Sequence, residues 1–171
     1  MTFQLTSTAF KNGGIIPDKF TCYGADISPA LAWSDPPANT QSFVLIVEDP
    51  EVPNRPLHHW LTWNLGVDKR ELPEGIAKAP LLSDGSRQGQ NDFEGFGYGG
   101  PSVRQGASHD YVFTLYALDS RPDVPPGSKY GALTQAMQGH VLAQAQLVGT
   151  FRLERRRARM LALEEDKEFV L

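Results

Sequence analysis

The stretch Gly95–Asp119, GFGYGGPSVRQGASHDYVFTLYALD, joins a glycine-rich loop to a histidine and a strongly patterned strand. Tyr111–Leu118 contains few polar residues, which predicts a strand near the centre of a sheet and covered on both faces. His109 and Tyr111 are two residues apart, so their side chains point to the same side of this strand. Because the glycines leave backbone N–H groups exposed, the stretch predicts a site for a small anion.

Outside this stretch, short apolar runs alternate with turn residues. The 16 glycines and 13 prolines are spread along the 171-residue chain and do not collect in a linker. This spacing is typical of a mainly β protein, and the runs predict its elements. We expect strands at 3–7, 15–22 (at a sheet edge), 31–33, 42–48, 57–65, 111–118 and 146–153, and one amphipathic helix at about 130–144.

The expected strand Leu57–Leu65, LHHWLTWNL, carries two adjacent histidines. Strict alternation places His59, Leu61 and Trp63 together with Leu65 on one face, and His58 on the other. Before this strand, the prolines of Asp49-Pro50-Glu51-Val52-Pro53 end the strand at 42–48, because proline removes an N–H from the ladder. Asp49 is therefore expected at a strand end.

Composition restricts the function classes. The net charge of -4 argues against general nucleic-acid binding, and neither a signal peptide nor a run of about 20 apolar residues is found. The single cysteine, Cys22, excludes an intrachain disulfide. We expect a cytoplasmic protein with one β domain at 1–153 and no membrane insertion.

A charged tail follows at 154–171, basic in its first half and acidic in its second. As a helix, the tail would oppose its own macrodipole, so it would need support from contacts elsewhere. Two such tails running antiparallel would match basic to acidic halves, which suggests a homodimer contact. The alternative is a solvated chain end.

The motifs argue against several familiar chemistries. Gly95–Gly100 is followed by Pro101 and a strand and does not open a helix, so dinucleotide and phosphate-loop fingerprints are rejected. No G-x-S-x-G elbow, H-E-x-x-H pattern or cysteine pair occurs, and no cofactor or metal is predicted. His58 and His140 are assigned packing or surface roles. His59 and His109 differ from them, since each opens a strand beside a proline-rich or glycine-rich turn.

Several segments, in this order along the chain, carry a family resemblance: Asp49–Pro53, His59-Trp60, Asn91–Phe93, Gly97–Pro101 and Gly106–Tyr111. As a set they resemble the phosphatidylethanolamine-binding proteins, specifically their bacterial Raf kinase inhibitor-like branch, over about residues 3–153. The resemblance implies an antiparallel Greek-key β-sandwich with a few peripheral short helices. It also implies a small pocket at one end of the sheet that binds phosphate, phosphoryl headgroups or similar anions.

Carried over by position, the resemblance implies a ligand site made of Asp49, Glu51, His59, Gly99, Gly100, Pro101, His109 and Tyr111. The family usually has Pro-Pro at Val103-Arg104, arginine at Asp110 and glycine at Glu94. An acid at position 110 lowers the local positive potential, and Arg104 can compensate from the loop.

Three functions are compatible with these residues. The favoured one is non-catalytic binding of a small phosphorylated or anionic ligand, with modulation of a protein partner. The first alternative is a hydrolase or other acid–base enzyme that uses the same Asp and His side chains. The second is a module that regulates a kinase or a protease.

Overall fold

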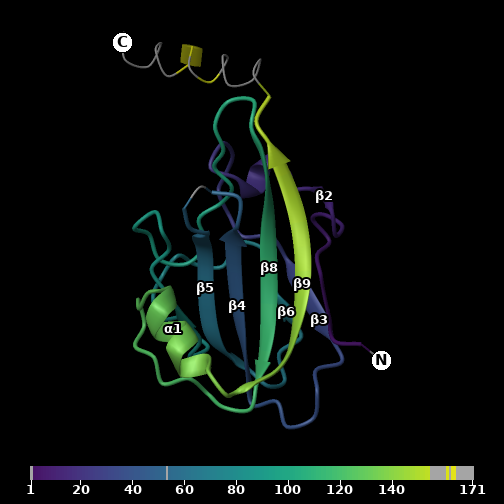
Figure 1. The fold of residues 1–171 in the computed structure, drawn as a ribbon, viewed down its shortest axis with the longest axis vertical. Coiled ribbons are helices and arrows are strands. Elements are labelled where there is room, and N and C mark those ends of the chain that lie inside the picture. The colour runs from purple at the N-terminus through teal and green to yellow at the C-terminus, as the bar shows by residue number, and fades with distance from the viewer. Residues whose placement is uncertain (1, 53, 155–160, 162, 165–171) are drawn as a thin grey trace.

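The computed structural model describes residues 2–52, 54–154, 161, 163 and 164. Over these residues the protein is mainly β, with two sheets and one α-helix (Figure 1). This confirms the expected fold class. The elements are β1 (Gln4–Thr6), β2 (Gly14–Ile15), the 3-10 helix η1 (Asp18–Phe20), β3 (Leu31–Ser34), β4 (Ser42–Asp49), β5 (Leu57–Gly66), β6 (Glu71–Leu72), β7 (Arg87–Gln88), β8 (Ser108–Leu118), α1 (Tyr130–Met137) and β9 (Val141–Arg152).

The larger sheet has six strands in the order β2-β9-β8-β4-β5-β7, and the smaller has three in the order β1-β3-β6. β8 lies between β9 and β4, so the predicted central position of this strand is confirmed. Pairing between the named strands is antiparallel, except that β2 runs parallel to β9 over two residues. This order is compatible with the Greek-key connection expected from the resemblance.

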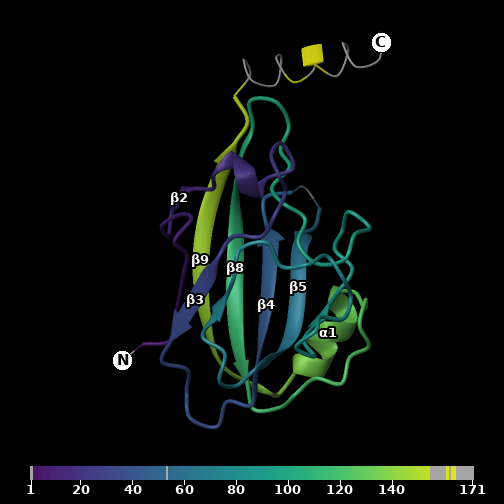
Figure 2. The same cartoon turned by 180° about the vertical axis from the view of Figure 1, so that it is seen from behind.

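The larger sheet is covered on both faces, which explains the continuous apolar run of β4. Phe43, Leu45 and Val47 belong to the core shared with the smaller sheet, which Figure 2 shows in front of β8 and β9. Val44 and Ile46 belong to a second core beneath α1, on the opposite face. Over Ser42–Val47 neither face of β4 meets water, and hence this part of the strand needs no polar alternation.

β5 departs from the predicted alternation at two β-bulges. Val47 pairs with Trp60 but the next residue, Glu48, pairs with His58, so His59 is an extra residue in the strand. As a result His59 packs against Tyr111 on the side of the smaller sheet, while His58 stacks on Tyr130 of α1. A bulge of this kind re-aims side chains and breaks the two-residue period.

The second bulge lies between the Phe43–Leu65 and Leu45–Thr62 pairs. It moves Leu65 into the core shared with the smaller sheet, while Leu61 and Trp63 stay in the core beneath α1. The expectation that His59, Leu61, Trp63 and Leu65 share one face is therefore wrong at both ends of the strand.

Two other element boundaries also differ from expectation. The helix expected at about 130–144 ends at Met137, and Gly139, with φ +79°, turns the chain into β9. β9 begins at Val141 and not at 146, because long-range pairing with β8 outweighs the apolar helical spacing. The edge strand expected at 15–22 is limited to β2, since Pro17 precedes a 3-10 turn.

Some expectations concern residues that lie outside the described part of the chain. These residues are Pro53 and, in the tail, 155–160, 162 and 165–171. The dimer contact of the tail therefore remains a hypothesis. Within the described part of the chain, no helix is long and apolar enough to cross a membrane.

Candidate functional site

One end of the larger sheet gathers the predicted side chains. Asp49 is the last residue of β4, while His59 and His109 lie near the starts of β5 and β8. Because these strands are antiparallel neighbours, the end of β4 meets the beginnings of the other two, at the upper edge of the sheet in Figure 1. The sheet thus brings together residues that are 60 positions apart in sequence.

His109 and Asp49 form a close pair, with 2.6 Å between Nδ1 of the ring and Oδ2 of the carboxylate. The Asp49 side chain is only 1% exposed, and its Oδ1 accepts the backbone N–H of Glu51 at 2.9 Å. A carboxylate held in this way keeps a proton on Nδ1 of the imidazole and fixes the orientation of the ring.

His59 is almost fully buried, at 1% exposure. Its Nδ1 lies 2.8 Å from the carbonyl oxygen of Gly99, and the rings of Phe93 and Tyr111 pack against it. Burial lowers the pKa of His59, although the Gly99 carbonyl and the charge of Asp49 oppose this effect. At neutral pH the ring is therefore uncharged.

Two buried polar atoms in this site have no hydrogen-bond partner among the described residues: Nε2 of His59 and the hydroxyl of Tyr111. Burial, followed by the charge of Asp49, raises the pKa of Tyr111, although the neighbouring backbone of Ser102 opposes this rise, so the hydroxyl keeps its proton and remains a donor. Buried polar atoms are normally paired, and unpaired ones call for an explanation. Both belong to residues predicted to bind ligand.

The glycine loop does not offer its amides to an anion, contrary to the sequence prediction. Gly95 donates its N–H to Oδ1 of Asn91, and Gly97 to the carbonyl of Gly89. The N–H groups of Gly99 and Gly100 are donated to the carbonyl of His59 and to Oδ1 of Asp26. The loop contributes by close packing, because a Cβ on Gly100 would lie 2.4 Å from the Phe20 carbonyl oxygen.

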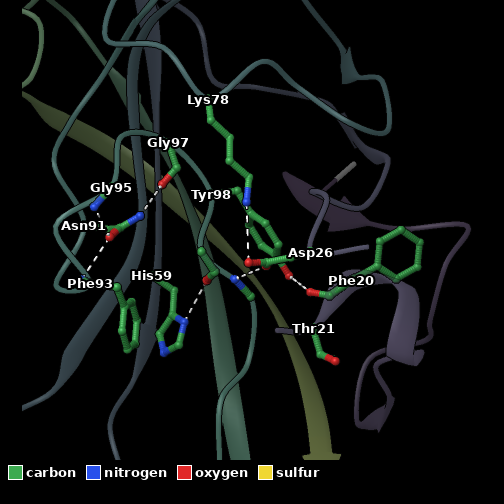
Figure 3. Close-up of polar contacts among 12 residues, drawn as sticks. Phe20, Thr21, Asp26, His59, Lys78, Asn91, Phe93, Gly95, Gly97 and Tyr98 are labelled. Carbon is green, nitrogen blue, oxygen red and sulfur yellow. Dashed lines mark hydrogen bonds and ion pairs between the residues drawn. The ribbon is translucent and has the colours of Figure 1, made fainter. Parts of the chain in front are cut away.

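Two further side chains hold the loop in place (Figure 3). Asn91 accepts the N–H groups of Phe93 and Gly95 and donates to the carbonyl of Gly97 at 3.1 Å. The Tyr98 hydroxyl donates to the carbonyl of Phe20, far away in sequence. These contacts fix the loop against β5 and the N-terminal segment.

A cavity of about 420 Å³ opens beside His109. Glu51 lines it, and the Glu51 carboxylate also accepts the backbone N–H of Asp110. Val103 and Arg104, two of the departures noted in the sequence, lie in its wall. The complete lining is Glu51, Val52, Leu57, Ser102, Val103, Arg104, Ala107 and His109.

Pro101 lies at the end of the glycine loop, and its carbonyl accepts the N–H of Cys22 at 3.1 Å. Neither Cys22 nor Asp26 was selected from the sequence, because both lie in the irregular segment after η1, where no periodicity marks a position. Among the described residues, no group of three or more His, Cys, Asp or Glu side chains could hold a metal ion.

The fold and the site together define a two-sheet β protein with a cavity at one sheet end that His109 lines. The sequence model of the phosphatidylethanolamine-binding protein family matches residues 6–152. The chain therefore belongs to the phosphatidylethanolamine-binding protein family.

Individual relatives agree with this assignment. The chain is 42% identical to a UPF0098 protein of Methanothermobacter thermautotrophicus over 87% of this chain and 98% of the relative. Among solved structures, a phosphatidylethanolamine-binding protein homolog from Chlamydia trachomatis has a TM-score of 0.80 at 39% identity, covering 88% of this chain and 97% of its own. YbcL of E. coli, described as a new member of the mammalian phosphatidylethanolamine-binding protein family, has a TM-score of 0.83 at 28% identity. The match covers 90% of this chain and 99% of YbcL.

Proposed function

We propose that this protein binds a small phosphorylated or otherwise anionic ligand, without catalysis, at the end of β4, β5 and β8. The observation that carries the proposal is the pair of buried, unpartnered atoms, Nε2 of His59 and the hydroxyl of Tyr111. A phosphoryl oxygen is a hydrogen-bond acceptor, and the Tyr111 hydroxyl and a protonated imidazole are donors. Such a ligand would accept directly from the Tyr111 hydroxyl, and from Nε2 of His59 once the neutral ring takes up a proton on binding.

The charges around the cavity support an ester better than a free dianion. Arg104 contributes the positive charge at the cavity, whereas Glu51 contributes a negative one. Asp110, whose carboxylate accepts the Thr150 hydroxyl at 2.7 Å, adds another negative charge close to Glu51. Val52 and Leu57 line the same cavity and provide an apolar wall for the organic part of a phosphate ester.

The proposal is tested by the thermal stability of the protein with inorganic phosphate or O-phosphorylethanolamine. At about 100 times Kd, a ligand stabilises the folded state by about 2.7 kcal/mol. For a chain of this size we expect Tm to rise by roughly 5–10 °C. The His59→Ala, His109→Ala double variant should lose this rise.

A matched control is available at the opposite end of β8. His140 pairs with Asp119 through Nδ1 and Oδ1 at 2.8 Å, which reproduces the His–Asp pair of the site without the cavity. His140→Ala should keep the full ligand-dependent rise in Tm. The proposal fails if millimolar ligand leaves the wild-type Tm unchanged, or if the double variant responds as the wild type does.

Acid–base catalysis is a second candidate, favoured by one observation. The buried Asp49 carboxylate holds Nδ1 of His109 at 2.6 Å, and His109 also lines the cavity. A histidine oriented by a buried carboxylate is the arrangement of a general base. Turnover of a phosphate or acyl ester that is abolished in His109→Ala and kept in His140→Ala would support this candidate, whereas a silent substrate panel would exclude it.

A further inference from the structure

A single peptide group connects His59 to an acidic residue on the far side of the glycine loop. The carbonyl of Gly99 and the N–H of Gly100 belong to the same peptide unit and point in opposite directions. The carbonyl accepts the Nδ1 proton of His59 at 2.8 Å, and the N–H donates to Oδ1 of Asp26 at 2.7 Å. The dashed lines in Figure 3 follow this path from His59 to Asp26.

The orientation of this peptide determines which nitrogen of His59 carries the proton. A carbonyl oxygen only accepts, so Nδ1 facing Gly99 must be protonated and the neutral ring presents a lone pair at Nε2. If the peptide turned over, the Gly100 N–H would face the ring, Nδ1 would become the acceptor and Nε2 would carry the proton. The two orientations thus give His59 opposite chemistry at its unpartnered nitrogen.

The peptide joins two glycines, the residue type with the weakest conformational preference, so its own backbone favours neither orientation strongly. Asp26 does favour one, because a carboxylate attracts an N–H and repels a carbonyl oxygen. The second oxygen of Asp26, Oδ2, lies 3.5 Å from Nζ of Lys78, which leaves Oδ1 for the Gly100 N–H.

We propose that Asp26 is a positioning residue that acts on His59 through the Gly99–Gly100 peptide and keeps Nε2 as the unprotonated, ligand-facing nitrogen. Its carboxylate also polarises the peptide, which strengthens the Gly99 carbonyl as an acceptor. The importance of this role for binding rests on the proposed ligand site. The state of the His59 ring itself is a property of the free protein.

The first experiment measures the imidazole nitrogens of ¹⁵N-labelled protein, without ligand, by long-range ¹H–¹⁵N correlation at neutral pH. The chain has 4 histidines, and a His59→Gln spectrum assigns the His59 signals. We expect the wild type to show one tautomer, with a protonated Nδ1 and an unprotonated Nε2. In Asp26→Ala the Nε2–H tautomer should appear, with a change of roughly tenfold or more in the tautomer ratio. Asp26→Asn keeps an oxygen that accepts the Gly100 N–H but loses the charge, so the ratio should change in the same direction by a smaller factor.

Asp84 provides a control with the same local architecture. Its Oδ1 accepts the backbone N–H of Ser86 at 2.9 Å, and its Oδ2 pairs with Lys69 at 3.0 Å. Asp84→Asn should leave the His59 tautomer unchanged. Asp26→Asn keeps nearly the shape of the side chain, so it still gives an answer if Asp26→Ala does not fold.

The proposal is overturned if both Asp26 variants keep the wild-type tautomer, or if Asp84→Asn shifts the tautomer ratio as much as they do. This result does not depend on ligand binding. If phosphate fails to raise Tm while the Asp26 variants still shift the tautomer, the proposed function is wrong and the role of Asp26 stands. If phosphate raises Tm and the Asp26 variants leave the tautomer unchanged, the proposed function stands and the role of Asp26 is wrong.

Discussion

At the scale of single residues, the protonation state of His59 sets the condition for the proposed anion binding. The pKa of His59 is lowered by burial, and the Gly99 carbonyl accepts a hydrogen bond from its Nδ1–H. The neutral ring therefore faces the site with a lone pair, which repels an anion. An anion at Nε2 must bring a proton of its own or cause the ring to take one up.

This argument predicts that anion affinity rises as pH falls. Binding raises the pKa of His59, so in the window between the free and bound pKa values one proton is taken up for each anion bound. Sulfate is a suitable probe because it stays a dianion throughout. We expect its Kd to fall by up to about tenfold per pH unit as the pH is lowered from the bound pKa of His59 to its free pKa, as measured by calorimetry.

His59→Gln separates this effect from other titrations, because an amide donates a hydrogen bond at any pH. The part of the pH dependence that is due to His59 should vanish in this variant and persist in His140→Gln. An unchanged slope in His59→Gln would assign the proton uptake to another group.

At the scale of elements, the sequence predicts those strands whose patterns are local. The apolar runs of β4 and β8 and their bounding turns were sufficient to locate both strands. β9 was shortened in the prediction because His140 and Val141 continue the helical spacing of α1, which extended the expected helix over Val141 and Leu142. Both side chains are more than a third exposed, and it is backbone pairing with β8 that makes them part of a strand. Pairing between distant segments is not visible in a local pattern.

The bulges of β5 were equally hidden from the sequence. A two-residue period assigns every side chain of Leu57–Gly66 to a face, and one inserted residue reverses the assignment beyond it. Asn64, with φ +56°, marks the second bulge, since asparagine tolerates left-handed backbone. His59 carries no comparable signal.

Close packing against β9 gives a prediction at this scale. A Cβ on Gly149, the partner of Tyr111 in the sheet, would lie 2.5 Å from Ile16 and 2.7 Å from Phe10. Gly149→Ala should therefore lower the free energy of unfolding by about 1–3 kcal/mol, as measured by urea denaturation.

Gly131 of α1 is the matched control, because a Cβ there meets nothing within 4 Å. Gly131→Ala should be neutral or stabilising by up to about 1 kcal/mol, since alanine favours the helix. Equal losses of stability in the two variants would show that packing at Gly149 is not the cause.

At the scale of the whole molecule, the two cores lie on opposite faces of the larger sheet. The core beneath α1 contains Leu133 and Met137, while the other core contains Tyr111 and adjoins the site. The two faces share only the backbone of the sheet. Stability and ligand binding can therefore be perturbed separately.

Leu133→Ala tests this separation. Leu133 is fully buried, so its truncation should lower the free energy of unfolding by about 2–5 kcal/mol. The rise in Tm caused by phosphate should remain as in the wild type. Gln135→Ala, at an exposed position of the same helix, should change stability by less than about 0.5 kcal/mol.

If the ligand-dependent rise in Tm disappeared in Leu133→Ala while the variant remained folded, the two faces would be coupled. The stacking of His58 on Tyr130, with 3.7 Å between ring centroids, is the contact that would carry such a coupling.

Much of the site could be predicted from the family resemblance, because its residues lie in recognisable segments. The structure joins His109 to Asp49 and packs His59 against Tyr111. Asp26 could not be predicted, since its role depends on the orientation of one peptide 74 positions away. Sequence spacing does not encode the direction of a peptide group.

The bulge at His59 separates the choice of side chain at this position from the pairing of the strand. Residue 59 is the extra residue between two ladder pairs, so its side chain is not matched to a partner across the strand. A substitution at this position would change the side chain at the proposed ligand site while the neighbouring pairs, Val47–Trp60 and Glu48–His58, keep their register. The strand thus holds one position at which the proposed ligand preference could change without a shift in the pairing of β4 with β5.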